Sequence, residues 1–193
     1  MTTLPPATGP LPGDAHPGHT LEPLTFPLWG SRLIEASAGT GKTWTIAALY
    51  LRLVLGHGGE HSAFAQPLGP ADILVMTFTR AATRELSDRI RARLLQAAQC
   101  FRGAAEVPAG DVFLAGLLAA YPEGDARQNA AWRLAMAAEG MDDAAVYTID
   151  AWCQRMLREH AFDSGCLFDE ELNADERAVQ TEAAQDYWRQ QCY

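Results

Sequence analysis

The chain has 193 residues, of which 48% are hydrophobic and 20% charged, as in an ordinary globular protein long enough to enclose a core. No apolar run is long enough to span a bilayer, and no basic residue precedes Arg32, so a secretory leader is not expected. We therefore expect a cytoplasmic protein with no membrane partner. The net charge of −9 does not exclude a polyanion partner, because charge can be unevenly distributed.

The first 25 residues differ from the rest in composition. They hold six of the eleven prolines and no basic residue, which predicts a disordered or loosely draped arm over 1–25. Phe26–Gly30 then enters the fold. Within it, we expect Trp29 to pack in the core rather than to lie against a nucleotide base.

The stretch Glu35–Thr43 fits the phosphate-binding pattern [A/G]-x-x-x-x-G-K-[S/T], with Ala36 where the strict motif has glycine. Its flanks agree with that motif, because Arg32–Ala36 reads as a short buried strand and Thr43–Leu55 has apolar residues at helical spacing. The residues predicted to contact a nucleotide are Ala36, Ser37, Ala38, Gly39, Thr40, Gly41, Lys42 and Thr43.

Each position of this P-loop has a physical role. Gly39 and Gly41 allow backbone conformations in which successive amides point into one concavity, and the following helix N-terminus favours an anion. Lys42 supplies a slim point charge between phosphates, and the Thr43 hydroxyl can ligate Mg²⁺. Lys42 is the only lysine beside fourteen arginines, so a guanidinium does not replace it here. ATP and Mg²⁺ are the predicted ligands, with Lys42 and Thr43 the predicted catalytic residues.

A second strand–helix pair follows. Ile73–Thr79 is continuously apolar at its start, which predicts a strand buried on both faces, and a helix is expected over Arg80–Ala98. Thr79 is placed to cap this helix, and Glu85 and Arg89 are spaced as an i,i+4 ion pair. The apolar stripe of the helix comprises Ala82, Leu86, Ile90, Leu94 and Ala97.

The remaining elements alternate in type, which favours an α/β fold with a largely parallel sheet and flanking helices. In chain order they are helices over Asp111–Tyr121 and Asp125–Glu139, a strand over Ala144–Ile149, a helix from Asp150 to about His160, a loop over Ala161–Leu172, and a helix from Asn173. Asp150 is expected to cap its helix, and the side chains of Trp152, Met156 and Leu157 are expected to face inward. Four widely spaced cysteines predict neither disulfides nor a metal site. Charge is split, with +4 over Arg80–Arg102 and −8 over Glu159–Asp186.

Two further segments resemble conserved helicase motifs. Ile73–Leu86 resembles the second motif of UvrD/Rep-type superfamily-one DNA helicases, in which a TFT strand end meets a helix, and Val146–Leu157 resembles the third. Arg32–Thr43 and Ala161–Phe168 are similar to the RecB-type members. The similarity covers residues 26–193. It implies that residues 26–172 form a RecA-like P-loop NTPase domain, which is an incomplete first motor domain. Residues 173–193 would then be the start of a helical insertion.

The resemblance also implies a function. RecB-type subunits use ATP to move along single-stranded DNA, act as helicase and exonuclease in double-strand break repair and recombination, and assemble with RecC-like and RecD-like subunits on DNA ends. The residues that match the single-stranded DNA track are Thr77, Thr79, Arg80, Arg84 and Thr148. Asp150 stands where the family usually has histidine, and no adenine-reading glutamine precedes the P-loop.

A helicase also needs an apolar strand that ends in Asp-Glu to hold Mg²⁺. The nearest pair, Asp169-Glu170, follows only three apolar residues and reads as loop. The chain is therefore expected to be the N-terminal part of a longer subunit and inactive by itself. A small P-loop kinase and a non-catalytic P-loop binding module are the alternatives, although neither an acceptor pocket nor a lid with paired arginines is recognisable.

Overall fold

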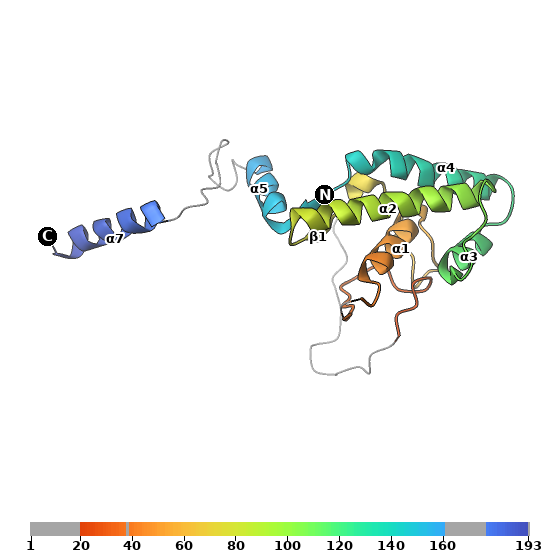
Figure 1. The fold of residues 1–193 in the computed structure, drawn as a ribbon, viewed down its shortest axis with the longest axis horizontal. Helices are drawn as coiled ribbons and strands as arrows, with labels where there is room; N and C mark the ends of the chain where they lie inside the picture. The colour runs from red at the N-terminus through yellow and green to blue at the C-terminus, as the bar shows by residue number, and fades with distance from the viewer. Residues whose placement is uncertain (1–19, 38, 161–176, 193) are drawn as a thin grey trace. The chain divides into compact units, whose positions relative to one another are not determined.

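The computed structural model describes residues 20–37, 39–160 and 177–192 (Figure 1). The chain divides into two compact units, Met1–Ile149 and Asp150–Tyr193. The elements in chain order are α1 (Lys42–Leu55), η1 (Pro70–Asp72), β1 (Val75–Thr77), α2 (Arg80–Phe101), α3 (Val112–Ala119), α4 (Asp125–Glu139), η2 (Gly140–Asp142), β2 (Val146–Thr148), α5 (Ile149–Glu159) and α7 (Arg177–Cys192). No helix among the described residues is both long and apolar enough to cross a membrane.

The two strands of the first unit form a parallel sheet. Val75 pairs with Val146 and Thr77 with Thr148, and the chain between the strands runs through α2, α3 and α4. An α/β fold with parallel pairing is therefore confirmed at this level. Because the strands run in the same direction, their carboxyl ends lie at one edge, which we call the strand edge and define by Thr77 and Thr148.

The core of the first unit is built by its helices. α2 lies along α4 (Figure 1), α1 packs against both, and α3 packs against α2. Apolar side chains that are fully enclosed come from all four helices: Leu51, Val54, Ile90, Leu94, Leu114, Leu117 and Leu134. The predicted stripe of α2 is buried from Leu86 onward, whereas Ala82, one turn earlier, is exposed. We call these four helices the helical core.

Several helix ends follow from local capping. Thr79 Oγ1 accepts a hydrogen bond from the backbone N–H of Ala82 at 3.1 Å, which confirms it as the N-cap of α2. Asp111 caps α3 in the same way, at 3.0 Å from the N–H of Leu114. α4 has its predicted bounds, because Gly124 and Gly140 stand at its two ends.

Two strand predictions are wrong in their extent or burial. Arg32–Ala36 is not a strand, and its side chains are exposed, with Leu33 at 85%. β1 is shorter than predicted and at most half-buried, since Val75 and Thr77 are only partly covered, Met76 is exposed, and so are Leu74 and Phe78 beside the strand. A strand needs a hydrogen-bonded neighbour and a covered face. Within the described part of the chain nothing pairs with residues 32–36, whereas β1 has a partner strand but an uncovered outer face.

In the segment before the P-loop, Leu24 is packed where a loose arm was predicted, and Trp29 is exposed where a core position was predicted. Residues 1–19 lie outside the described residues, but Leu24 packs against the helical core, so the fold begins before residue 26. Trp29 is 49% exposed, which contradicts its expected core position. Its indole N–H donates to the carbonyl oxygen of His61 at 3.1 Å, and this partner holds the ring at the surface.

The second unit contains α7 and nearly all of α5. α5 begins at Ile149, so Asp150 lies in its first turn and the prediction of an Asp150 cap is wrong. A carboxylate there still interacts favourably with the helix dipole. α5 has no fully buried residue, and Leu157, predicted to face inward, is exposed. The predicted loop Ala161–Leu172 and residues 173–176 lie outside the described residues.

Candidate nucleotide and nucleic-acid site

The loop before α1 has the backbone that a phosphate site requires. Gly39 and Gly41 have positive φ angles of 79° and 86°, a conformation that disfavours other residues. Gly41 is the N-cap residue of α1 and supplies no side-chain cap, so no side chain competes for the first amides of the helix. Space around both glycines is open. The partial positive charge of the helix N-terminus therefore faces open space that no side chain fills.

Lys42 is folded back over this loop. Its ammonium Nζ donates to the carbonyl oxygens of Ser37 at 2.6 Å and Ala36 at 3.2 Å. The hydroxyl of Thr40 donates to the same Ser37 oxygen at 2.8 Å. These hydrogen bonds close the loop and hold the Lys42 ammonium at the loop opening. A phosphate oxygen can replace the carbonyl oxygens there as the acceptor.

A hollow of about 410 Å³ adjoins the loop. Its polar part includes the P-loop and the first turn of α1, and its apolar part comes from residues before the loop and from α1. It is lined by Leu21, Ile34, Glu35, Ala36, Ser37, Thr40, Lys42, Thr45 and Ile46. Four of the predicted nucleotide contacts thus line one hollow, while Ala38 lies outside the described residues.

Thr43, the predicted Mg²⁺ ligand, lines a different hollow. This second one, of about 370 Å³, lies between α1 and α2 and is lined by Thr43, Trp44, Ala47, Arg89, Ala92, Arg93 and Gln96. Successive residues of a helix point in directions about 100° apart, which accounts for the separation of Thr43 from Lys42. The part that the structure describes contains no group of three or more His, Cys, Asp or Glu residues that could hold a metal ion.

A buried ion pair supports the wall of this second hollow. Arg93 and Asp111 form two hydrogen bonds, at 2.5 and 2.9 Å, and both side chains are about nine-tenths buried. The hydrogen bond from Arg93 holds the pKa of Asp111 below its ordinary value, although burial opposes this. Trp44 lies edge-on to Phe113 at 5.7 Å, and the Arg93 guanidinium is 5.9 Å from the Trp44 ring. The ion pair therefore links α2 and α3 to the first turn of the P-loop helix.

The threonines predicted to contact DNA are engaged within the protein. Thr77 Oγ1 lies 2.6 Å from the hydroxyl of Thr83 and 3.2 Å from the carbonyl oxygen of Thr79. The Thr79 hydroxyl is the N-cap of α2. Thr148, beside Thr77 in the sheet, is only 9% exposed. These side chains shape the strand edge more than they offer free hydroxyls.

The predicted basic residues lie next to this edge. Arg80 and Arg84 are exposed at the start of α2, directly after β1. Glu85 and Arg89 form the predicted i,i+4 pair at 3.1 Å. The strand edge therefore combines a helix N-terminus with two exposed guanidinium groups, an arrangement that attracts a backbone phosphate.

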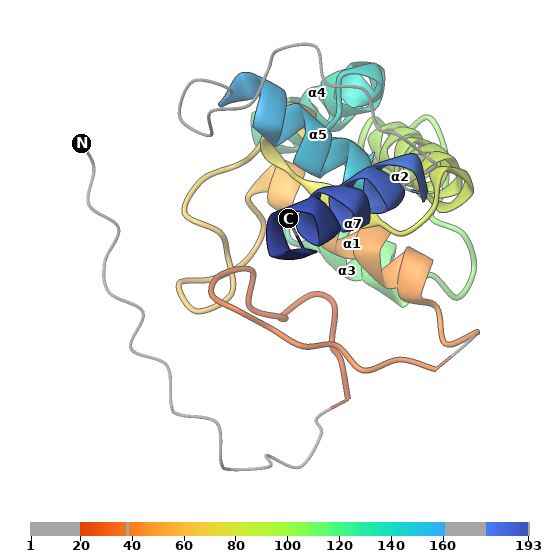
Figure 2. The same ribbon diagram turned by 90° about the vertical axis from the view of Figure 1, so that its left-hand side faces the viewer.

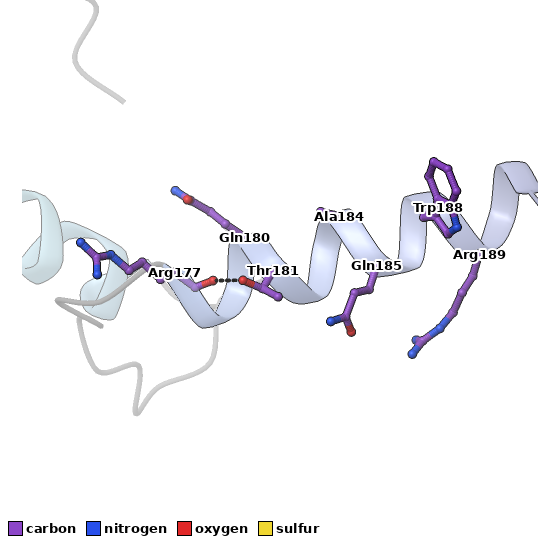
Figure 3. Close-up of a pocket in the computed structure, with 7 residues that line it drawn as sticks. All are labelled: Arg177, Gln180, Thr181, Ala184, Gln185, Trp188 and Arg189. Atoms are coloured by element: carbon purple, nitrogen blue, oxygen red, sulfur yellow. Dashed lines mark hydrogen bonds between the residues drawn. The ribbon is translucent and has the colours of Figure 1, made fainter.

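α7 also carries a surface hollow, which Figure 3 shows with its seven lining side chains. They are Arg177, Gln180, Thr181, Ala184, Gln185, Trp188 and Arg189. All belong to one helix, so the hollow has a single wall and does not enclose a ligand.

Two residues were missed by the sequence analysis, one at the P-loop hollow and one further along α1. Leu21 was assigned to the N-terminal arm, yet it lines the hollow with Lys42. Arg52 was not singled out, yet it is fully buried in α1. A charged residue between Leu51 and Val54, on the apolar side of α1, was the available signal, because an unpaired charge rarely occupies such a position.

The chain was also compared with known proteins. The family described as UvrD/REP helicase N-terminal domain matches residues 20–192. The chain is 49% identical over 175 residues to the RecBCD enzyme subunit RecB of Escherichia coli (strain K12), and 42% identical over 174 residues to that of Haemophilus influenzae. Each match covers 90% of this chain and 14% of the relative. The RecB subunit of Mycobacterium tuberculosis (strain H37Rv) is 30% identical over 80% of this chain.

These matches confirm the resemblance and favour a helicase over a small P-loop kinase. The chain spans about one seventh of the length of these relatives, since it covers 14% of each of the first two. The match to the family extends across the P-loop, both strands and α7. The chain therefore belongs to the family described as UvrD/REP helicase N-terminal domain.

Proposed function

We propose that this chain is the ATP-binding N-terminal part of a RecB-like DNA helicase and exonuclease subunit. The proposal includes a RecA-like first motor domain over residues 26–172 and the start of a helical insertion at 173–193. The sequence similarity to RecB subunits supports it, as does the parallel pairing of β1 with β2. Of the arm proposed for residues 1–25, the described part packs on the fold at Leu24, so the boundary between arm and domain lies before residue 24.

The observation that carries the proposal is the P-loop itself. Two glycines in the left-handed region precede a helix without a side-chain cap, and Lys42 lies across the loop mouth beside a hollow of about 410 Å³, a volume within the range of small-molecule pockets. The amides would bind the phosphate oxygens, and Lys42 would neutralise the terminal phosphates. Thr43, which lines the second hollow in this structure, is the residue that would hold Mg²⁺, and the ion would supply charge neutralisation when it is bound.

The strand edge supports a second part of the proposal, contact with single-stranded DNA. Arg80 and Arg84 would bind backbone phosphates beside the α2 N-terminus, while Thr77, Thr79 and Thr148 would form the surface under the strand. In the intact subunit, ATP binding and hydrolysis would drive movement along the strand. RecC-like and RecD-like subunits and DNA ends are the proposed partners, in double-strand break repair.

Calorimetry of the purified chain with Mg²⁺-ATP tests nucleotide binding. We expect a measurable heat for the wild type and none for Lys42→Ala, because the loop then lacks its only lysine. Arg32→Ala is the matched control, since it removes a nearby cation that lies over Trp29 and does not line the hollow. Absence of heat from the wild type, or equal binding by Lys42→Ala, contradicts the proposal.

A further inference from the structure

The first turn of α1 bears the proposed phosphate contacts, yet its own residues stabilise it poorly. Gly41 offers no side-chain cap, and the turn contains no acidic residue. Lys42 places a positive charge at the positive end of the helix dipole. The next four residues, Thr43–Ile46, are β-branched or aromatic, and such residues are weaker helix formers than alanine. Free amides and a lysine suit an anion, but they weaken the turn that carries them.

The chain around this turn gives it little support. Figure 2 shows residues 20–37 as an irregular red-to-orange trace that leads towards α1, and this stretch contains no helix or strand. The hydrogen bonds from Lys42 to Ala36 and Ser37 stay within the loop. The first buried residue of α1 is Ala47, more than one turn further on. The turn therefore depends on a tertiary contact to hold it in place.

Trp44 supplies a contact of this kind. Its ring lies edge-on to Phe113 of α3, with the ring centroids 5.7 Å apart, and the Arg93 guanidinium of α2 is 5.9 Å from the centre of the Trp44 ring. Arg93 is also 5.8 Å from the Phe113 ring, so ring–ring and cation–ring contacts join three helices. We call Trp44, Phe113 and Arg93 the Trp44 cluster.

The two partners of Trp44 are themselves held in place. Phe113 is buried in the helical core. Arg93 donates to both carboxylate oxygens of Asp111 and to the side-chain oxygen of Gln96 at 2.7 Å. The Trp44 cluster therefore connects a locally weak turn to well-packed parts of α2 and α3.

The position of Trp44 separates it from direct ligand contact. The hollow beside Lys42 is lined by Thr45 and Ile46 of α1 but not by Trp44. Trp44 lines the second hollow instead, together with Ala47. An effect of Trp44 on nucleotide binding would therefore pass through the conformation of the turn.

We infer that Trp44 is a positioning residue for nucleotide binding: by contact with α2 and α3 it holds the first turn of α1 in the conformation in which Lys42 and the free amides can bind phosphate. The inference rests on the proposed function. In that conformation the Thr45 amide donates to the carbonyl oxygen of Gly41 at 2.8 Å, which closes the turn. A turn that is open part of the time binds phosphate only in its closed fraction, so the apparent affinity falls by that fraction.

Hydrogen exchange measured by NMR on the ligand-free chain tests the role of the cluster without a nucleotide. For Trp44→Ala, we expect exchange of the Thr45 amide to accelerate about threefold to tenfold, the factor that an aromatic pair contributes to an equilibrium constant. Trp44→Phe keeps an aromatic ring and should keep the wild-type rate. Trp132→Ala is the matched control, since Trp132 is an exposed tryptophan of α4 that lines neither of the two hollows beside α1.

Calorimetry with Mg²⁺-ATP and with inorganic tripolyphosphate and Mg²⁺ tests the consequence for binding. Both ligands carry the phosphates, so Trp44→Ala should weaken both by the same factor of about threefold to tenfold. Trp44→Phe and Trp132→Ala should bind like the wild type. A urea titration of each variant shows that it is folded, and a variant that is merely less stable but still folded binds as tightly as the wild type.

The outcomes separate this inference from the proposed function. Faster Thr45 exchange with an equal loss for both ligands in Trp44→Ala, restored in Trp44→Phe, supports the inference. A wild type that binds both ligands while Trp44→Ala binds them equally well overturns the inference and leaves the proposed function standing. Weaker binding with unchanged Thr45 exchange, or a loss confined to ATP, also overturns it, because Trp44 would then act other than through the turn. A wild type that binds neither ligand overturns both.

Discussion

The helical core and the strand edge of the same unit are built in opposite ways. In the helical core, Ile90, Leu94 and Leu134 are fully enclosed. Around the strands, Phe78 is 87% exposed and the sequence before the P-loop has no strand partner among the described residues. Both regions are apolar in sequence, so hydrophobicity alone does not explain the difference.

Stability and ligand binding therefore depend on different parts of this unit. The four helices bury one another, so the helical core contributes most of the apolar burial that stabilises the unit. The loop and strand ends carry the uncapped helix, Lys42 and the exposed arginines. Substitutions in the core should therefore change unfolding, and substitutions at the strand edge should change binding.

The largest effect is expected at Asp111. Asp111→Ala removes the carboxylate that pairs with buried Arg93 and caps α3, so we expect about 3–5 kcal/mol of destabilisation in chemical denaturation. Because the pKa of Asp111 in the folded protein lies below its ordinary 3.8, the ionised carboxylate stabilises the fold above pH 3.8, and this stabilisation is lost as pH falls through the folded pKa. Asp111→Asn should therefore reduce the decrease of the free energy of unfolding at acid pH. An unchanged decrease in this variant contradicts the role of Asp111.

The next effect contrasts two leucines. Leu94→Ala leaves a cavity in the helical core and should lower the free energy of unfolding by about 2–5 kcal/mol. Leu33→Ala, at an exposed position, should change it by no more than about 0.5 kcal/mol. Urea titrations of both variants compare them directly. Equal losses would mean that the Leu33 region is as well packed as the core.

The third prediction concerns DNA. Arg80→Glu combined with Arg84→Glu should weaken binding of a labelled single strand by more than about tenfold at low salt, because two phosphate contacts are removed. Arg102→Glu, at the other end of α2 and also exposed, is the matched charge reversal and should have little effect. Fluorescence anisotropy measures all three proteins. If the double variant binds DNA as tightly as the wild type, the DNA contacts do not lie at the strand edge.

The smallest effect is expected at the α2 cap. Thr79→Ala removes the hydrogen bond to the Ala82 amide and should destabilise the chain by about 1 kcal/mol, whereas Thr79→Ser should retain it. Thermal unfolding monitored by circular dichroism resolves this difference. If the serine variant loses as much as the alanine variant, the hydroxyl is not the stabilising group.

The sequence by itself determined the local features. Capping of α2 by Thr79, the bounds of α4, the apolar stripe from Leu86 onward and the glycines before Lys42 all depend on residues within a few positions of one another. The RecB resemblance followed from motif residues in order along the chain. Parallel pairing was also predictable, because strands alternate with helices.

The tertiary structure decided which apolar segments are covered and which distant residues meet. Burial of a strand depends on neighbours that its own residues do not specify, so Arg32–Ala36 and Phe78 were predicted to be more enclosed than they are. The approach of Trp44 to Phe113 and Arg93 depends on how α1, α2 and α3 pack, and that packing joins residues far apart in the chain. Local periodicity records no such long-range contact, because it reflects only the direction of each side chain from its own element.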